Sequence, residues 1–328
     1  MRAVLCLLLF TPLTSLAKPD LSGVWNFSTL TPLERPVEFG DKAVLTPSEA
    51  QALLQKVLPP DKKDEPYGVA KLDVEVYNDF WFDAGQELDV ERRTSLIIDP
   101  PNGRLPKVLP EAEAHRLAQN KKRKFPVRAL ATFSVGPDYP HEHPESLGLS
   151  ERCLVGFNAG PPITPSFYNN NLRIVQTEAY VMLMTEMVHD VRIIPLDGRS
   201  HLPEHIHQWL GVPRGHWDGD TLVVETKNFT DKVPAFTLPV NLSVQEVNGA
   251  LGSGTDLHVT ERFSLTEAGL LKYEATRTAP KTFVMPFTMR VYMRPTRDKI
   301  YEYACHEANY GMEGILKGVR RREADGEI

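Results

Sequence analysis

Hydrophobic and polar residues alternate with a period of two from about residue 171 onward, and turn residues such as those at 218–220 and 267–269 interrupt the alternation. This pattern is typical of β-strands that bury one face. Because no helical segment of crossover length separates the strands, we expect them to pair as an antiparallel meander. The predicted strands span residues 172–177, 180–185, 188–196, 221–226, 257–265, 270–278, 287–294 and 300–305.

The first half of the chain has a different pattern. Most of the 27 prolines precede residue 166, so long regular elements are not expected there. Two short helices are predicted. Thr46-Pro47-Ser48-Glu49 forms a capping box that leads into a helix up to residue 58, and Pro110 opens a second helix that extends to about residue 121. We expect this Pro-rich, partly helical segment, about residues 30–165, to pack on the outside of the β domain.

An additional strand signal lies near the N-terminus, at residues 21–27. Its Gly23-Val24-Trp25 sequence resembles the opening of lipocalin-type barrels, in which the indole packs across the closed end. We therefore predict a mainly β fold, an antiparallel meander closed as a lipocalin-like barrel, with a β-sandwich as the alternative.

The N-terminus predicts export. Arg2 precedes the apolar run 3–10, and Ser15-Leu16-Ala17 offers small residues for cleavage, the layout of a secretory signal peptide. Cleavage near Ala17 leaves residues 18–328, which we expect to form a single domain in the periplasm or outside the cell. The apolar run is too short to span a bilayer, and no later segment comes closer.

The net charge limits the possible partners of the chain, and the cysteine content predicts the redox state of its thiols. The formal net charge of −6 provides no basic field for nucleic acid, and the basic runs 121–124 and 320–322 lack interleaved aromatic residues. Once Cys6 leaves with the signal peptide, Cys153 and Cys305 remain. An even number in an oxidising compartment predicts a disulfide, and two unpaired thiols are the alternative.

The first candidate site lies in residues 186–192, a segment otherwise built like a buried strand. In an unbroken strand Glu186, Asp190 and Arg192 share one face and His189 points to the other, unless a break near Met187 turns His189 toward them. Burial of such groups shifts pKa values and creates proton-transfer sites. The alternative is a structural Asp190–Arg192 ion pair beside a hydrogen-bonded histidine.

Six motifs resemble a family of secreted bacterial proteins that are generally labelled hypothetical. They are residues 93–106, 150–154, 156–162, 168–171, 186–199 and 301–310. The resemblance covers nearly the whole exported chain and implies its location, but no particular activity. Two of the motifs place Cys153 and Cys305 beside charged residues, which suggests that a disulfide ties together two ends of one site.

A second candidate cluster follows the last predicted strand, where loop residues at a barrel mouth can meet a ligand. For the asparagines the alternative is turn formation through their own backbone. The apolar side of strand 257–265 also carries a carboxylate, Glu261, which is either ligand-facing or part of a buried pair. The residues of this second group are Tyr303, His306 and Glu307, with Asn158, Tyr168 and Asn169 to Asn171 (Asn170 at the centre) expected at the same mouth.

Metal binding is a competing hypothesis. His201, His205 and His207 have spacings that permit chelation, as do His141 and His143. Exposed histidines in a polar loop are the simpler interpretation, because none of the established metal motifs accompanies them. Dinucleotide, phosphate-loop and nucleophile-elbow motifs are also missing from the sequence, so we expect no cofactor.

These observations favour an enzyme that performs metal-independent elimination, isomerisation or hydrolysis on a small, partly apolar molecule held in the barrel. In this hypothesis His189 is the acid–base group, Asp190 and Glu186 orient it, Arg192 stabilises charge and His306 is a second proton-transfer group. The alternatives are a lipocalin-type binding protein without turnover and a metal-binding protein that uses the histidine-rich loop.

Overall fold

The computed structural model describes residues 18–57, 85–122, 144, 148–150, 152–166, 168–237, 250–307 and 309–326. The predicted signal peptide, His141 and His143 lie outside these residues, as does part of the basic run 121–124.

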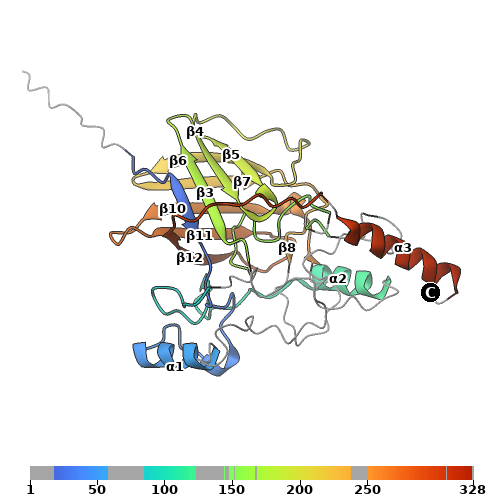
Figure 1. Cartoon of the computed structure of the whole chain (residues 1–328), viewed down its shortest axis with the longest axis horizontal. Helices are drawn as coiled ribbons and strands as arrows, with labels where there is room; N and C mark the ends of the chain where they lie inside the picture. Colours follow the sequence, from blue (N-terminus) through green and yellow to red (C-terminus); the bar gives the residue numbers. More distant parts are fainter. Residues whose placement is uncertain are drawn as a thin grey trace, which may run out of the picture.

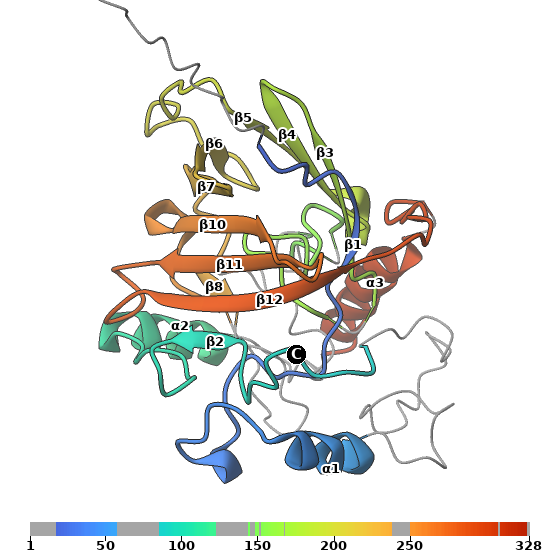
Figure 2. The same ribbon diagram turned by 90° about the vertical axis from the view of Figure 1, so that its left-hand side faces the viewer.

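Ten strands form one antiparallel sheet that curls into a nearly closed barrel (Figure 1). Their order is β5-β4-β3-β1-β12-β11-β10-β7-β6, and β2 pairs with β12 beside this path. In Figure 2, β10, β11 and β12 form one wall, and β3, β4 and β5 lie across from them. The predicted mainly β, lipocalin-like barrel is therefore confirmed. The strands are β1 Gly23–Asn26, β2 Ile97–Asp99, β3 Asn171–Gln176, β4 Tyr180–Thr185, β5 Val191–Pro195, β6 Val212–Asp218, β7 Thr221–Lys227, β10 His258–Leu265, β11 Leu271–Thr278 and β12 Phe287–Pro295.

The barrel closes between β5 and β6, the two ends of this strand order. A methyl group at Gly215 of β6 would lie 2.7 Å from Ile194 Cγ2 and 2.7 Å from Leu196 Cδ2. The β6 backbone therefore lies directly against Ile194 of β5 and against Leu196, which follows β5. β6 was not predicted, because Pro213 and Gly215 interrupt its alternation. Glycine is required here by the close approach of the two strands.

Side chains from alternate strand positions fill the barrel interior, as expected for strands with one buried face. Two hydrophobic clusters result. The first, the Trp25 cluster, contains buried residues of β1, β3, β4, β5, β7, β10, β11 and β12, and the Trp25 indole donates to Leu21 O (3.0 Å). The second, the Phe236 cluster, includes the small sheet of β8 (Phe236–Thr237) and β9 (Ala250–Leu251). The buried members of the Phe236 cluster are Ile97, Phe229, Ala235, Phe236, Leu251, Leu257, Val259, Ala279, Phe283 and Phe287.

Both predicted helices are present, as α1 (Pro47–Val57) and α2 (Pro110–Lys122). The capping box of α1 is formed: Glu49 N–H donates to Thr46 Oγ1 (3.3 Å), and Thr46 N–H donates to Glu49 Oε2 (2.9 Å). A third helix, α3 (Tyr310–Ala324), was not predicted because three glycines weaken its helical signal. It buries none of its residues.

One predicted strand is absent from the described residues, and one predicted strand begins later than expected. Residues 300–305 pair with no strand in the described part of the chain, and Tyr301 keeps 69% of its surface exposed, so the alternation there is not that of a half-buried strand. Strand 188–196 begins only at Val191, because a turn precedes it.

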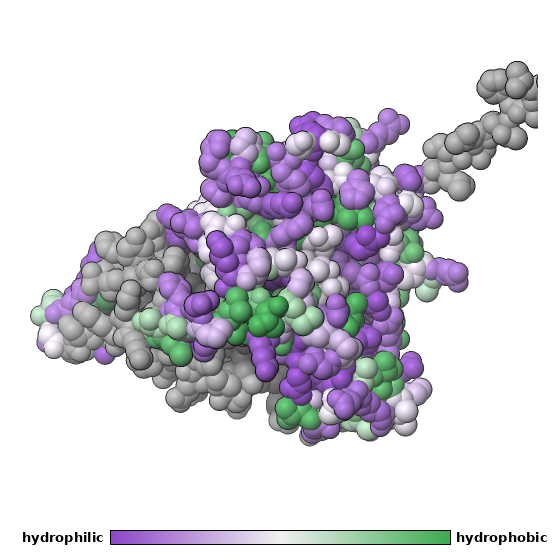
Figure 3. All heavy atoms as spheres, turned by 180° about the vertical axis from the view of Figure 1, so that it is seen from behind, coloured by the Kyte–Doolittle hydropathy of each residue, from purple (hydrophilic) through white to green (hydrophobic). Residues whose placement is uncertain are grey.

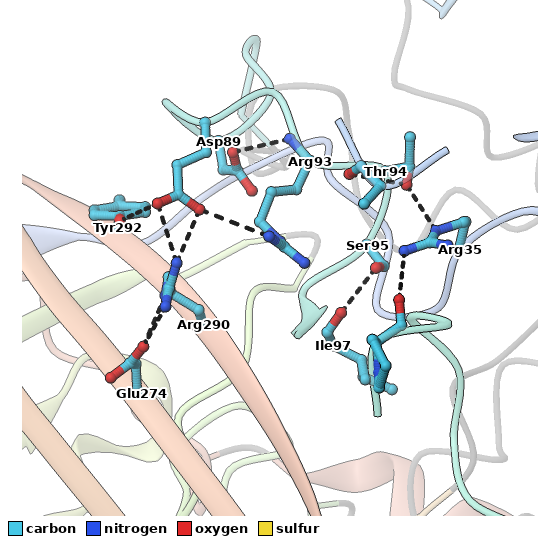
Figure 4. Close-up of polar contacts among 12 residues, drawn as sticks. Arg35, Asp89, Arg93, Thr94, Ser95, Ile97, Glu274, Arg290 and Tyr292 are labelled. Atoms are coloured by element: carbon cyan, nitrogen blue, oxygen red, sulfur yellow. Dashed lines mark hydrogen bonds and ion pairs between the residues drawn. The ribbon is translucent and has the colours of Figure 1, made fainter. Parts of the chain in front are cut away.

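Polar contacts hold the segment 85–105 on the outer face of β11 and β12 (Figure 4). Glu91 accepts hydrogen bonds from Tyr292 Oη (2.7 Å) and Arg290 Nη1 (3.0 Å), and Arg290 Nε also donates to Glu274 (2.8 Å). Burial together with Glu91 raises the pKa of Tyr292 to about 12. This network fixes Glu91 against β11 and β12.

The buried Arg35 connects this segment with the chain that follows β1. Its Nε donates to Thr94 Oγ1 (3.0 Å) and its Nη2 donates to Pro101 O (3.0 Å), as Figure 4 shows. Arg35 is buried, so its guanidinium needs hydrogen-bond partners from the protein. These two neutral oxygen acceptors provide them and hold the side chain in place.

The face seen in Figure 3 is mainly hydrophilic, with a compact hydrophobic patch near its centre. Among the described residues, no helix has both the length and the apolar character needed to span a membrane. The large hydrophobic side chains lie mostly in the barrel clusters, which is the distribution that hydrophobic burial favours.

Candidate functional site

A sharp turn interrupts the chain between β4 and β5. It is the short helical turn η6 (Met187–His189), in which Val188 (φ 58°) and His189 (φ 45°) adopt left-handed backbone angles. Such angles are uncommon for a β-branched residue such as valine. The break predicted near Met187 is therefore present. It buries Met187 and Val188 and leaves the His189 side chain exposed.

The turn lies against the C-terminal segment 301–305. Glu186 accepts from Asn171 Nδ2 (2.8 Å) and from the Tyr301 backbone N–H (3.2 Å), and His189 Nδ1 lies 3.2 Å from Tyr303 O. His306 and Glu307 are exposed. Residues of the two predicted clusters thus lie beside each other, with His189, His306 and Glu307 exposed and Glu186 buried.

Asp190 is the most perturbed carboxyl group of this turn. It is half-buried, and its Oδ2 accepts from the Gly156 backbone N–H (2.8 Å). Burial raises its pKa to about 6, although the Gly156 hydrogen bond and the nearby His189 and Arg192 act in the opposite direction. Gly156 packs tightly there, since a methyl group would lie 2.5 Å from Met187 Cγ.

Arg192 points into the barrel and pairs with Glu261. The ion pair is bidentate, with Nη1–Oε2 2.6 Å and Nη2–Oε1 2.9 Å, and Glu261 is 0% exposed. The alternative Asp190–Arg192 ion pair is not formed between these described residues, because Glu261 holds the Arg192 guanidinium through both of its oxygens. For Glu261, the structure decides in favour of a buried pair.

Tyr273 completes this internal cluster. Its hydroxyl donates to Glu261 Oε1 (2.8 Å) and accepts from the Ile163 backbone N–H (2.9 Å). Burial raises the pKa of Tyr273 well above its ordinary value. Burial alone would lower the pKa of Arg192, but the Glu261 carboxylate reverses the shift and raises it. Glu261 therefore bonds to both Arg192 and Tyr273, and the charges of this cluster are those of the Arg192–Glu261 ion pair.

The loop 156–170 brings Ile163 into the barrel, and asparagines close it. Asn158 Nδ2 donates to Ser166 Oγ (2.9 Å) and to Tyr168 O (3.3 Å). Asn170 accepts from the Ser166 N–H (2.9 Å) and donates to Ser166 O (2.9 Å). Both asparagines are fully buried. Their contacts are those of the turn-forming alternative.

The predicted Cys153–Cys305 disulfide is confirmed, with the two Cα atoms 5.7 Å apart. It joins loop 152–156 to the C-terminal segment, beside the Glu186–Asp190 turn. Asn309 Nδ2 also lies 3.5 Å from Cys153 Sγ. The disulfide and this contact of Asn309, the residue before α3, together hold the start of α3 at the same surface.

The histidine-rich loop is spread out. His201 Nε2 lies 3.1 Å from Glu225 O, whereas His205 and His207 are exposed. In the part of the chain that the structure describes, no group of three or more His, Cys, Asp or Glu side chains is arranged to hold a metal ion.

Sequence reasoning missed Arg277, which lies on the interior face of β11. Val259 is its partner on β10, and Thr226 of β7 is the partner of Val259 on the far side. The guanidinium carbon of Arg277 lies 5.0 Å from the centre of the Phe236 ring, while Arg277 Nε and Thr226 Oγ1 are enclosed without a hydrogen-bond partner. Burial lowers the pKa of Arg277 to about 10. The period-two spacing from Leu271 could have revealed this inward-facing cation.

The comparisons with known proteins add little to this geometry. The sequence matches no family model and no curated protein, so the resemblance to secreted bacterial proteins stays a prediction. One solved structure, a mutant of the fluorescent protein UnaG, is similar over 39% of this chain and 72% of that chain, with 14% identity and a TM-score of 0.22. A TM-score this low establishes neither a common fold nor a common function.

Proposed function

We propose that this protein binds a small, partly apolar molecule at the end of the barrel lined by the Phe236 cluster. The observation that carries the proposal is the position of Arg277. Its side chain is only partly exposed and lies on the interior face among aromatic residues, with Nε enclosed and unpartnered. Binding sites for small molecules have this composition, a mostly apolar lining with a few polar groups.

The hydrogen-bonding state of this region supports the proposal. The great majority of enclosed polar atoms in folded proteins have a partner. Thr226 Oγ1 and Arg277 Nε have none, whereas the neighbouring Glu261 and Tyr273 are satisfied by each other. A ligand with a polar group would supply the partners that the described residues do not provide.

Binding is tested with octanol as a neutral amphipathic probe, octanoate and octylammonium as charged ones, and mass spectrometry for a ligand that co-purifies with the full chain. We expect at least one probe to bind and Phe236→Ala to weaken that binding. Phe39→Ala is the matched control, because Phe39 packs in a separate cluster around Leu45 and Leu88. If none of the probes binds and no ligand co-purifies, the proposal is wrong.

A second candidate function is acid–base catalysis at the Glu186–Asp190 turn, which the raised pKa of Asp190 favours. A carboxyl group with a pKa of about 6 exchanges protons efficiently near neutral pH. In this proposal Asp190 and the exposed His189 transfer protons, with Glu186 and His306 nearby. Arg192 would act only through Asp190, because its own guanidinium is held by Glu261.

The catalytic candidate is tested by incubating the protein with a metabolite extract and following it by mass spectrometry. We expect a compound to be consumed, and the consumption to be lost in Asp190→Asn but kept in Asp197→Asn. Asp197 is the matched control because it is an exposed carboxylate paired with Arg199 in the following turn. Equal consumption by both variants would remove Asp190 from the mechanism.

We also propose that the chain is exported after cleavage near Ala17. The Cys153–Cys305 disulfide supports this location, because such bonds persist mainly in oxidising compartments. N-terminal sequencing of the protein recovered from the expressing cells should begin near Lys18. An intact N-terminus in a cytoplasmic fraction would contradict export.

A further inference from the structure

We infer that the molecule bound at the Phe236 end of the barrel is an anion whose carboxylate or similar oxyanion pairs with Arg277. This inference rests on the proposed binding function and adds the charge class of the ligand. Two arginines of the described strands, Arg192 and Arg277, face the barrel interior and differ in their partners.

The first of these arginines, Arg192, shows how the fold neutralises an interior cation. Its guanidinium meets the Glu261 carboxylate through two hydrogen bonds, at 2.6 Å and 2.9 Å. An isolated charge in such surroundings is costly, and pairing with an opposite charge offsets that cost. The Arg192–Glu261 pair is therefore complete without any ligand.

The second arginine, Arg277, has no such partner. No carboxylate among the described residues forms an ion pair with it, and its only cation–π contact is with the Phe236 ring at 5.0 Å. The one electrostatic neighbour that acts on its pKa is Tyr273, whose hydroxyl is already bonded to Glu261. Arg277 therefore presents a positive charge that the described residues leave unbalanced.

The surroundings of Arg277 define the rest of the ligand. Phe236, Phe283 and Phe287 contact one another edge to face, with ring centres 5.5–5.7 Å apart. This aromatic group suits an apolar body next to the charged end. Thr226 lies two strands from Arg277, about 10 Å away at the strand spacing of a β-sheet, and its hydroxyl can meet a second polar group.

The charge class is tested by calorimetric titration of the full chain with three probes of equal length: octanoate, octanol and octylammonium. We expect octanoate to bind at least about tenfold more tightly than octanol, because a charge-assisted pair with arginine is stronger than a neutral hydrogen bond. Octylammonium should bind most weakly, since it would place a second cation beside Arg277.

Variants assign the effect to Arg277. Arg277→Met and Arg277→Gln should each reduce octanoate affinity by about tenfold or more while changing octanol affinity by less than about threefold, and Arg277→Lys should retain part of the preference. Arg262→Met is the matched control, because Arg262 lies on the outer face of the adjacent strand and pairs with Asp218. Circular dichroism confirms that each variant is folded, and the two neutral variants provide independent tests.

The outcomes separate this inference from the proposed function. Equal binding of octanoate and octanol by the natural protein would overturn the inference and leave the binding function intact. Binding of octanol or octylammonium without octanoate would do the same. An octanoate preference that survives in folded Arg277→Met or Arg277→Gln would assign the charge recognition to another residue and overturn the inference.

Discussion

Arg192 and Glu261 form a bidentate ion pair across the inside of the barrel, with both nitrogen–oxygen distances below 3.0 Å. Arg192 belongs to β5, one end of the strand order, whereas Glu261 belongs to β10, the third strand from the other end. The pair therefore connects the edge strand β5 with a strand near the opposite edge of the sheet, across the gap that backbone hydrogen bonds leave open. We conclude that it braces the closure of the barrel.

Removal of one partner of this pair should destabilise the protein strongly. Glu261→Gln leaves Arg192 as an uncompensated buried cation, so we expect the free energy of unfolding to fall by about 3–5 kcal/mol. The Arg192→Met, Glu261→Met double variant should lose less than Glu261→Gln, because it buries no charge. Urea unfolding followed by tryptophan fluorescence measures both values. If Glu261→Gln costs no more than Asp218→Asn, which breaks an exposed pair with Arg262, the bracing role is wrong.

Tyr273→Phe tests the link between the ion pair and the loop 156–170. The substitution removes the hydrogen bond to Glu261 and leaves the Ile163 N–H without its acceptor. We expect a loss of about 1–3 kcal/mol in unfolding free energy, because a buried donor is left unsatisfied. Hydrogen exchange should also accelerate at Ile163. Unchanged exchange at this amide would show that the loop is held in the barrel by other contacts.

The raised pKa of Asp190 predicts a pH dependence of stability with a defined sign. Because the pKa is higher in the folded state (about 6) than its ordinary value of 3.8, the contribution of this group to stability is complete below about pH 4 and is lost as pH rises through 6. Asp190→Asn cannot ionise. The unfolding free energy of Asp190→Asn minus that of the natural protein should therefore increase by up to about 3 kcal/mol between about pH 4 and pH 7.

Urea unfolding at several pH values measures this gain, and Asp197→Asn serves as the control. The pKa of Asp197 is lowered by its hydrogen bonds with Arg199, so its removal should produce no gain with rising pH. A parallel pH dependence of Asp190→Asn and the natural protein would show that Asp190 titrates as an ordinary exposed carboxyl group.

Loss of the disulfide should lower stability through the unfolded state. The bond joins residues 152 positions apart, and the chain-entropy model gives an upper value of about 5 kcal/mol for such a loop. We expect the Cys153→Ser, Cys305→Ser double variant to lose about 2–5 kcal/mol in urea unfolding. Dithiothreitol should produce a similar loss in the natural protein and no change in the variant. Identical unfolding midpoints with and without the bond would contradict this prediction.

The candidate site was only partly visible in the sequence. The unusual residues of segment 186–192 were identified, but strand parity alone suggested an Asp190–Arg192 pair, whereas the Arg192 guanidinium pairs with Glu261 of a distant strand. Asn158 and Asn170 were recognisable as either ligand contacts or turn formers, and their hydrogen bonds to Ser166 and its neighbours decide the matter. Arg277 was overlooked because a single arginine in an alternating strand ordinarily faces solvent.

The sequence by itself determined most strands of the large sheet, their antiparallel arrangement and the first two helices, because these depend on local alternation, turn residues and caps that a short window contains. It also determined the choice of Cys153 and Cys305 as partners, since only two cysteines remain after the predicted signal peptide. The tertiary structure alone decided that Glu261 neutralises Arg192 and that Arg277 has no counterion in the described part of the chain. Such pairings join strands far apart in the chain, and the curvature of the whole sheet sets which inward-facing side chains meet.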